Sequence, residues 1–166
     1  VVFVEGALPF EEVRADVIRE QSNYNQARTT EVLTASSERV EPKCAAFGMC
    51  GGCAMQHINP RAQIAAKQRV LEDNLQRIGQ VKPEVILRPI AGPAWGYRYR
   101  ARLSVRNVHK KGEVLVGFRE KNGSYVANMT ACEVLPKHIS DLLPKLRELI
   151  GLTSIADHIP QIEVAV

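Results

Sequence analysis

The stretch PKCAAFGMCGGCAMQH, residues 42–57, decides how this chain has to fold, because it places three of the four cysteines within ten positions. These are Cys44, Cys50 and Cys53, spaced C-x5-C-x2-C, and Cys132 is a distant fourth. Three glycines lie among them. Cysteines that only fill an apolar core are scattered along a chain, so such a dense group in a glycine-rich loop indicates a chemical role.

Four thiols can form disulfides, carry out redox chemistry or bind a metal. Disulfides need an oxidising compartment, for which nothing in the sequence argues. A redox pair at Cys50 and Cys53 would open a helix in a βαβ unit, and no such unit is visible. Structural zinc usually takes two close pairs of ligands, whereas a cubane iron–sulfur cluster suits one loop with three thiolates and a remote fourth. The spacing favours an iron–sulfur cluster and leaves zinc as the alternative.

The composition is that of a globular chain. Its 166 residues are 45% apolar, enough for one ordinary core or two small ones. No apolar run approaches the roughly 20 residues that span a bilayer, so we expect a soluble protein without a membrane partner. The opening VVFVEGALPFEEV carries no charged leader and no initiator Met, which indicates a strand entered in mid-course.

Basic residues gather in one region. Residues 97–121 hold eight Lys and Arg against two Glu, a local charge of +6 in a chain of +4. In YRYRARLSVR, residues 97–106, a period of two places the arginines on one face and the apolar residues on the other. Concentrated positive charge predicts a polyanion partner, with a solvated sheet face as the alternative. The predicted RNA-binding residues are Arg98, Arg100, Arg102, Arg106, Lys110 and Arg119.

The residue pattern predicts a mixed, mostly β fold with one long helix. Strands are expected over residues 1–8, 13–20, 27–35, 97–108, 113–120, 124–129 and 159–166. A helix is expected over about 60–78, with Asn59 as N-cap and Gly79 as C-cap, and a short helix within 137–150. The long helix should bury a stripe of Ile64, Leu71, Leu75 and Ile78.

Three segments together resemble the bacterial RNA uracil-C5-methyltransferases, especially those acting on 23S ribosomal RNA. CGGCAMQHINPRAQIAAKQRVL, residues 50–71, is similar to the segment that carries and follows the cluster cysteines of that family. FVEGALPFEEV, residues 3–13, resembles the family's TRAM domain, and residues 97–106 resemble its central-domain strand. One position departs from the pattern, because Phe10 stands where the family usually has Gly after Leu-Pro.

The resemblance implies a domain organisation and a cofactor. Residues 1–38 would be a TRAM domain, a partial OB-like β-barrel truncated at its start, and residues 39–166 an incomplete α+β central domain. Cys44, Cys50, Cys53 and Cys132 would ligate a 4Fe-4S cluster. The Rossmann-like catalytic domain would be missing from this chain.

The reaction of this family requires catalytic residues that this chain does not contain. Such enzymes add a cysteine thiolate to uracil C6, and the resulting enolate takes the methyl group of S-adenosylmethionine before a base removes the C5 proton. All four cysteines here are committed to the cluster and no glycine-rich cofactor turn is visible. We therefore expect no catalytic residue and no activity in this chain alone. The implied parent enzyme would be monomeric and cytoplasmic, with 23S rRNA and its own C-terminal catalytic domain as partners.

Two alternative functions stay open at this point. The chain could be a stand-alone iron–sulfur module that binds RNA or senses redox state. It could equally come from a uracil-C5-methyltransferase that acts on tRNA.

Overall fold

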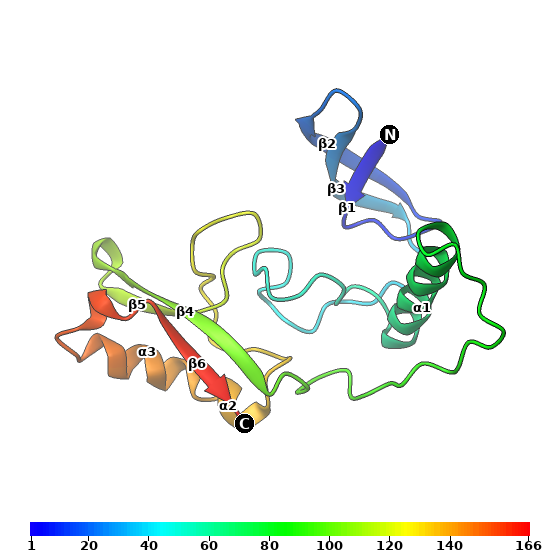
Figure 1. Cartoon of the computed structure of the whole chain (residues 1–166). Coiled ribbons are helices and arrows are strands. Elements are labelled where there is room, and N and C mark those ends of the chain that lie inside the picture. Colours follow the sequence, from blue (N-terminus) through cyan, green and yellow to red (C-terminus); the bar gives the residue numbers. More distant parts are fainter.

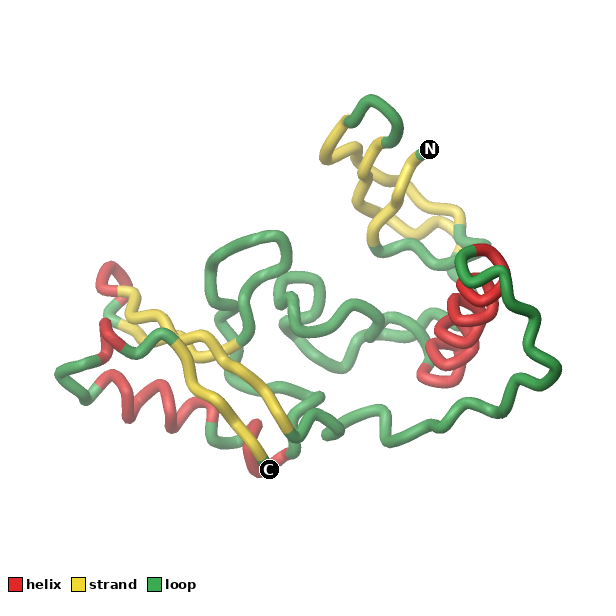
Figure 2. The backbone as a smooth tube through the Cα atoms, viewed as in Figure 1, coloured by secondary structure: helices red, strands yellow, loops and turns green.

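The computed structural model describes residues 1–166 as two small sheets at opposite ends of an extended molecule, connected mostly by loops (Figures 1 and 2). The strands are β1 (Val2–Glu5), β2 (Glu12–Glu20), β3 (Asn25–Thr34), β4 (Arg100–Val108), β5 (Glu113–Gly117) and β6 (Gln161–Ala165). The α-helices are α1 (Pro60–Arg77), α2 (Lys137–Ser140) and α3 (Leu143–Gly151), with 3-10 turns η1 (His109–Lys111) and η2 (Ala156–His158). None of the helices has the length and apolar character needed to cross a membrane.

The first sheet has the order β1-β3-β2, with β1 parallel and β2 antiparallel to β3. Its three strands match those expected within residues 1–35. The sheet has two free edges and is open, so these strands do not close a barrel.

A strained turn follows β1. Phe10 has φ 67°, in the left-handed region that glycine enters without steric cost, and its side chain is fully exposed. The backbone at this position therefore suits glycine, the residue expected there from the family pattern, better than phenylalanine. The next residue stabilises the turn, since the Glu11 carboxylate accepts hydrogen bonds from the backbone N–H groups of Leu8 (2.8 Å) and Ser36 (3.0 Å).

The second sheet, ordered β5-β4-β6 and antiparallel throughout, forms the main core with α3 packed against β5. Leu103 and Leu143 are completely buried, and 14 buried residues form one apolar cluster here. Cys50 and Cys132 belong to this cluster. The cysteine loop, residues 42–57, is thus part of the core although it lies far from β4 in sequence.

Helix α1 begins as expected, because the Asn59 side chain accepts a hydrogen bond from the Arg61 N–H (2.9 Å). The C-cap residue of α1 is Ile78, one position before the predicted Gly79, and the left-handed residue that follows is Gln80 (φ 51°). The predicted buried stripe was also wrong. No residue of α1 is buried, and Leu71 and Ile78 are 52% and 79% exposed.

The structure corrects three further expectations. Tyr97 and Tyr99 are exposed, because β4 begins only at Arg100 and the period-two pattern starts later than predicted. Residues 124–129 form no strand and contribute only a bridge between Arg119 and Val126. The region 137–150 holds two helices, since Pro144 occupies the first turn of a new helix, α3.

Candidate metal centre

The four predicted cysteine ligands gather at the edge of the main core. Cys50 and Cys132 are buried, and Cys44 and Cys53 pack against the same cluster. All four are free thiols. Cys44 and Cys53 each act electrostatically on the thiols of both Cys50 and Cys132, so the loop brings all four into mutual range.

The loop is held against the segment that follows β5, and this explains its glycines. The Gly51 N–H donates to the Arg119 carbonyl (2.9 Å), and the Lys121 N–H donates to the Met49 carbonyl (2.7 Å). A Cβ at Gly51 would lie 3.1 Å from that Arg119 carbonyl, and a Cβ at Gly52 would lie 3.0 Å from the Phe118 ring. Both positions favour glycine, because a side chain there would force the neighbouring atoms to move by a few tenths of an ångström.

Backbone N–H groups point at two of the sulfurs. The Gly52 N–H donates to the Cys50 sulfur (3.4 Å), and the backbone N–H groups of Val134 and Leu135 lower the pKa of the Cys132 thiol. Such donors stabilise a thiolate, which is the form that binds a metal.

Two buried polar side chains fix the backbone of the cysteines themselves. The Cys44 N–H donates to Oε1 of Gln56 (3.1 Å), and the Cys132 N–H donates to Oγ of Ser140 (2.8 Å). Gln56 and Ser140 are both buried. Neither role is predicted by the sequence pattern. The position of Gln56 in the CGGC-x-x-Q segment is a signal for one of them, and Ser140 has no such signal.

Burial raises the pKa of the Cys50 and Cys132 thiols, and the neighbouring cysteines raise it further. Against these effects, the Gly52 N–H and the charge of Arg98 lower the pKa of Cys50. With its pKa raised, each buried thiol stays protonated at neutral pH until a metal displaces the proton, so metal binding at this site should release protons.

The cysteines differ in how they would suit the two candidate groups, zinc and an iron–sulfur cluster. No three Cys, His, Asp or Glu side chains of the chain converge closely enough to hold a single metal ion. Zinc requires all its donors within about 2.0–2.3 Å of one point, whereas each thiolate of a cubane cluster binds a different iron. The four thiols share one edge of the core, but in this structure they do not converge on a single point.

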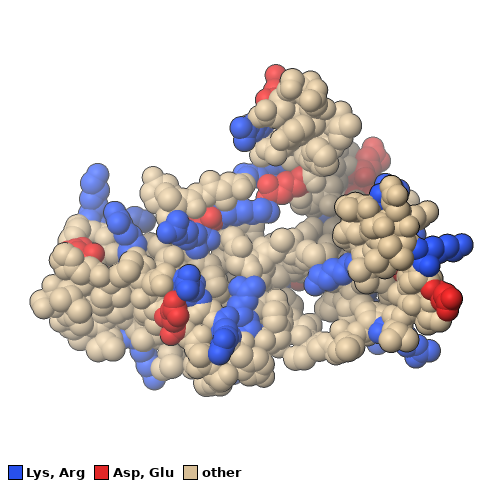
Figure 3. Space-filling model, in the orientation of Figure 1, with Lys and Arg blue, Asp and Glu red and all other residues tan.

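The predicted RNA-binding residues fall into two groups. Arg100, Arg102 and Arg106 are exposed side chains of β4, and Arg102 is paired with Glu163 (2.9 Å). Lys110 and Arg119 are exposed just beyond β4 and β5. In Figure 3 the visible face of this half carries more basic than acidic side chains. Arg98 lies apart, half-buried before β4 with its guanidinium 5.3 Å from the centre of the Phe118 ring.

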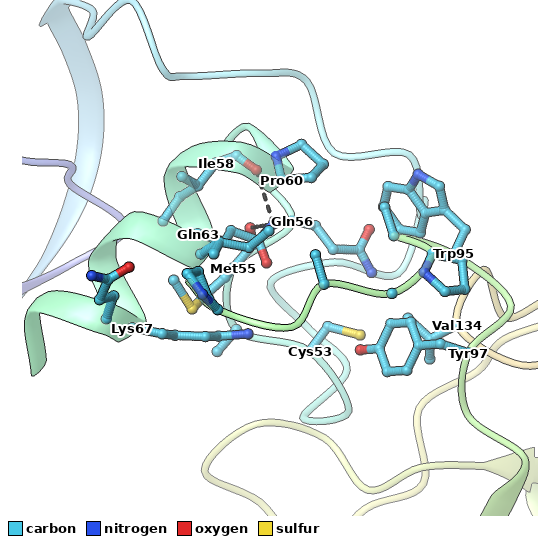
Figure 4. Close-up of a pocket in the computed structure, with 18 of the residues that line it drawn as sticks. Cys53, Met55, Gln56, Ile58, Pro60, Gln63, Lys67, Trp95, Tyr97 and Val134 are labelled. Atoms are coloured by element: carbon cyan, nitrogen blue, oxygen red, sulfur yellow. Dashed lines mark hydrogen bonds between the residues drawn. The ribbon is translucent and has the colours of Figure 1, made fainter. Parts of the chain in front are cut away.

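A cavity of about 780 Å³ separates α1 from the cysteine loop and from the connecting segment 86–98. Figure 4 shows Cys53, Trp95 and Tyr97 on one side of it, with Met55 and Gln63 on the other. Most of its lining is apolar. The side chain of Gln63, in the first turn of α1, ties the helix to the loop before it by donating to the carbonyls of Ile58 (2.9 Å) and Met55 (3.0 Å).

Comparison with known proteins first identifies a class of enzyme. No family model matches the chain. A solved structure, the Pyrococcus abyssi tRNA (uracil-54, C5)-methyltransferase in complex with S-adenosyl-L-homocysteine, superposes with a TM-score of 0.55 at 25% identity, covering 90% of this chain and 32% of that one. The chain thus has the fold of part of an RNA uracil-C5-methyltransferase.

Curated relatives narrow the class. The 23S rRNA (uracil(1939)-C(5))-methyltransferase RlmD of Cupriavidus necator is 61% identical over all 166 residues, which correspond to 38% of its length. The RlmD proteins of Ralstonia nicotianae and Bordetella avium are 60% and 59% identical, and the chain spans 37% and 35% of them. Along its whole length the chain is therefore similar to part of the 23S rRNA uracil-C5-methyltransferases, which confirms the resemblance drawn from its motifs.

Proposed function

We propose that this chain is the RNA-recognition portion of an S-adenosylmethionine-dependent 23S rRNA uracil-C5-methyltransferase, acting in the cytoplasm. The observation that carries the proposal is 61% identity, without interruption of coverage, to a relative of that name. The tRNA alternative rests on a structure at 25% identity and is less favoured. A free-standing module is less favoured still, because the matched relatives are enzymes of nearly three times this length.

Within that function, residues 1–38 would be the TRAM part and residues 39–166 the central domain. Cys44, Cys50, Cys53 and Cys132 would hold a 4Fe-4S cluster. When bound, the cluster would supply metal–thiolate bonds that tie the cysteine loop to the far segment carrying Cys132, and hence folding free energy. Since all four cysteines are placed at this site, the nucleophilic cysteine would come from another part of the enzyme.

RNA would be bound by the arginine face of β4. Arg100 and Arg106 are exposed and form no ion pair, so both charges are available to phosphates. Helix α3 occupies the opposite side of the sheet against β5, which leaves the arginine face uncovered. Arginine suits this role because its planar guanidinium binds phosphate oxygens and stacks on bases.

Helix α1 would be covered by the remainder of the enzyme. An 18-residue helix with no buried residue is only marginally stable alone, and its exposed Leu71 and Ile78 indicate a missing partner. The relatives have more than 60% of their length outside the matched part, ample for the cofactor-binding domain. We propose that this domain packs against α1 and fills the cavity beside it.

The activity is tested with the full-length protein and a radiolabelled methyl donor. We expect label in a 23S rRNA transcript and not in a tRNA transcript, and the residues 1–166 alone should transfer none. Label in tRNA only would contradict the ribosomal assignment.

The RNA face is tested by salt dependence of binding. Replacing Arg100 and Arg106 by Gln should reduce the slope of log affinity against log salt by about 1.5, at roughly 0.7 to 0.9 per lost phosphate contact. The matched control replaces Arg77 and Lys145, exposed charges of α1 and α3 that form no ion pair, and should leave the slope unchanged. Equal reductions in both variants would mean that only net charge matters.

A further inference from the structure

Arg98 connects the two parts of the chain that carry the cysteines. Its backbone N–H donates to the carbonyl of Val134 (2.8 Å), two residues beyond Cys132. Its Nη2 donates to the carbonyl of Gly52 (3.4 Å), between Cys50 and Cys53. One residue therefore binds the loop with three thiols on one side and the segment with the fourth on the other.

The guanidinium is held in place by its surroundings. It lies over the Phe118 ring at 5.3 Å, and the same ring fills the space beside Gly52. Arg98 has no carboxylate partner. Its positive charge is thus half-buried next to the loop and is not neutralised by any acid.

Lys43, another cation near the site, is neutralised by an acid. Lys43, adjacent to Cys44, pairs with Glu133, adjacent to Cys132, at 2.6 Å and lies 5.5 Å from the centre of the Trp95 ring. This ion pair also joins the two segments, but its charges cancel. Arg98, by contrast, has no acid beside it, and its charge acts on the Cys50 thiol.

Four thiolates bring four negative charges, which exceed the positive charge of a divalent metal or of a cubane cluster, so the loaded site is an anion in a partly apolar setting. We propose that Arg98 is a positioning residue of the metal site, joining the loop of Cys50 and Cys53 to the segment of Cys132 and offsetting the negative charge of the bound group. The inference rests on the proposed cysteine site. It also removes Arg98 from the RNA face, where the sequence pattern placed it.

The test uses the 1–166 chain reconstituted anaerobically with iron and sulfide, and compares the wild type with Arg98→Met, Arg98→Lys and Arg106→Met. Arg106→Met is the matched control, since it removes an equal charge from an exposed position of β4. Arg98→Met should lose its metal to a chelator at least about 10-fold faster, as removal of residues that support metal ligands typically does. Arg98→Lys should recover much of the difference, and Arg106→Met should behave as the wild type.

A second measurement separates charge from simple loss of packing. Removing a nearby positive charge disfavours the reduced, more negative cluster, so the reduction potential of Arg98→Met should become more negative while that of Arg98→Lys stays close to the wild type. Equal chelator rates and equal potentials in Arg98→Met and Arg106→Met would overturn the role of Arg98 alone. A wild-type chain that binds no metal would overturn the cysteine site itself, and this inference with it.

Discussion

Replacement of Gly52 by Ala tests whether the cysteine loop is positioned by close backbone packing. A Cβ at this position would lie 3.0 Å from Cδ2 and 3.3 Å from Cγ of Phe118, and 3.4 Å from the Cys50 sulfur. Because ordinary carbon contacts begin near 3.4 Å, the ring or the loop has to withdraw by about 0.4 Å or more. The ring cannot move freely, since Arg98 lies against it.

The magnitude follows from two opposing effects. Overpacking of a filled site typically costs about 1–3 kcal/mol, whereas a Gly to Ala change restricts the unfolded chain and returns about 0.4–1 kcal/mol. We expect a net loss of about 1–2 kcal/mol in the free energy of unfolding. For a chain of this size that corresponds to a decrease in Tm of about 2–8 °C.

The assay is denaturant and thermal unfolding of the metal-free chain, followed by iron content after reconstitution. Gly92→Ala is the matched control, since no atom lies within 4 Å of its added Cβ and its φ is not positive. That control should be neutral or slightly stabilising. Adding Phe118→Leu to Gly52→Ala should reduce the extra cost by removing the ring edge. If Gly52→Ala and Gly92→Ala unfold alike and bind equal iron, the packing argument is wrong.

Three further predictions concern other parts of the chain. Phe10→Gly should stabilise the chain by about 0.5–1 kcal/mol. A left-handed backbone costs an L-residue about 1–2 kcal/mol, and the greater chain entropy of unfolded glycine offsets about 0.5–1 kcal/mol of the gain. Destabilisation of this variant in chemical denaturation would refute the prediction. The Arg39 guanidinium and two backbone N–H groups lower the pKa of Glu11 from 4.5 to about 2, so the ionised carboxylate stabilises the fold above pH 4.5 and this stabilisation is lost as pH falls towards 2. Glu11→Gln should flatten that pH dependence in unfolding titrations, and an unchanged profile would contradict it. Cys132→Ser should lower iron content, Tm and RNA affinity together, whereas loss of iron alone would mean that the cluster does not support the fold.

Local patterns in the sequence predicted most of the strands and the long helix, and they suggested the four cysteines as ligands. The alternation of residues in β2, β3 and β4 and the cap at Asn59 act over a few neighbouring residues, so their physical cause is contained in the sequence itself. The cysteine spacing likewise acts within ten residues and indicated a metal group.

Only the tertiary structure showed where the Arg98 side chain lies and whether the apolar stripe of α1 is buried. A period-two pattern placed Arg98 with the arginines of β4, but the hydrogen bond of its backbone to Val134 lies outside the strand and turns its side chain towards Gly52. The apolar stripe of α1 predicted burial, yet burial needs a partner surface, and none of the 166 residues supplies it. Local pattern therefore indicated which segments form strands or a helix and which cysteines are candidate ligands. The pairing of distant segments determined which residues meet, because contact between residues far apart in sequence depends on how the whole chain packs.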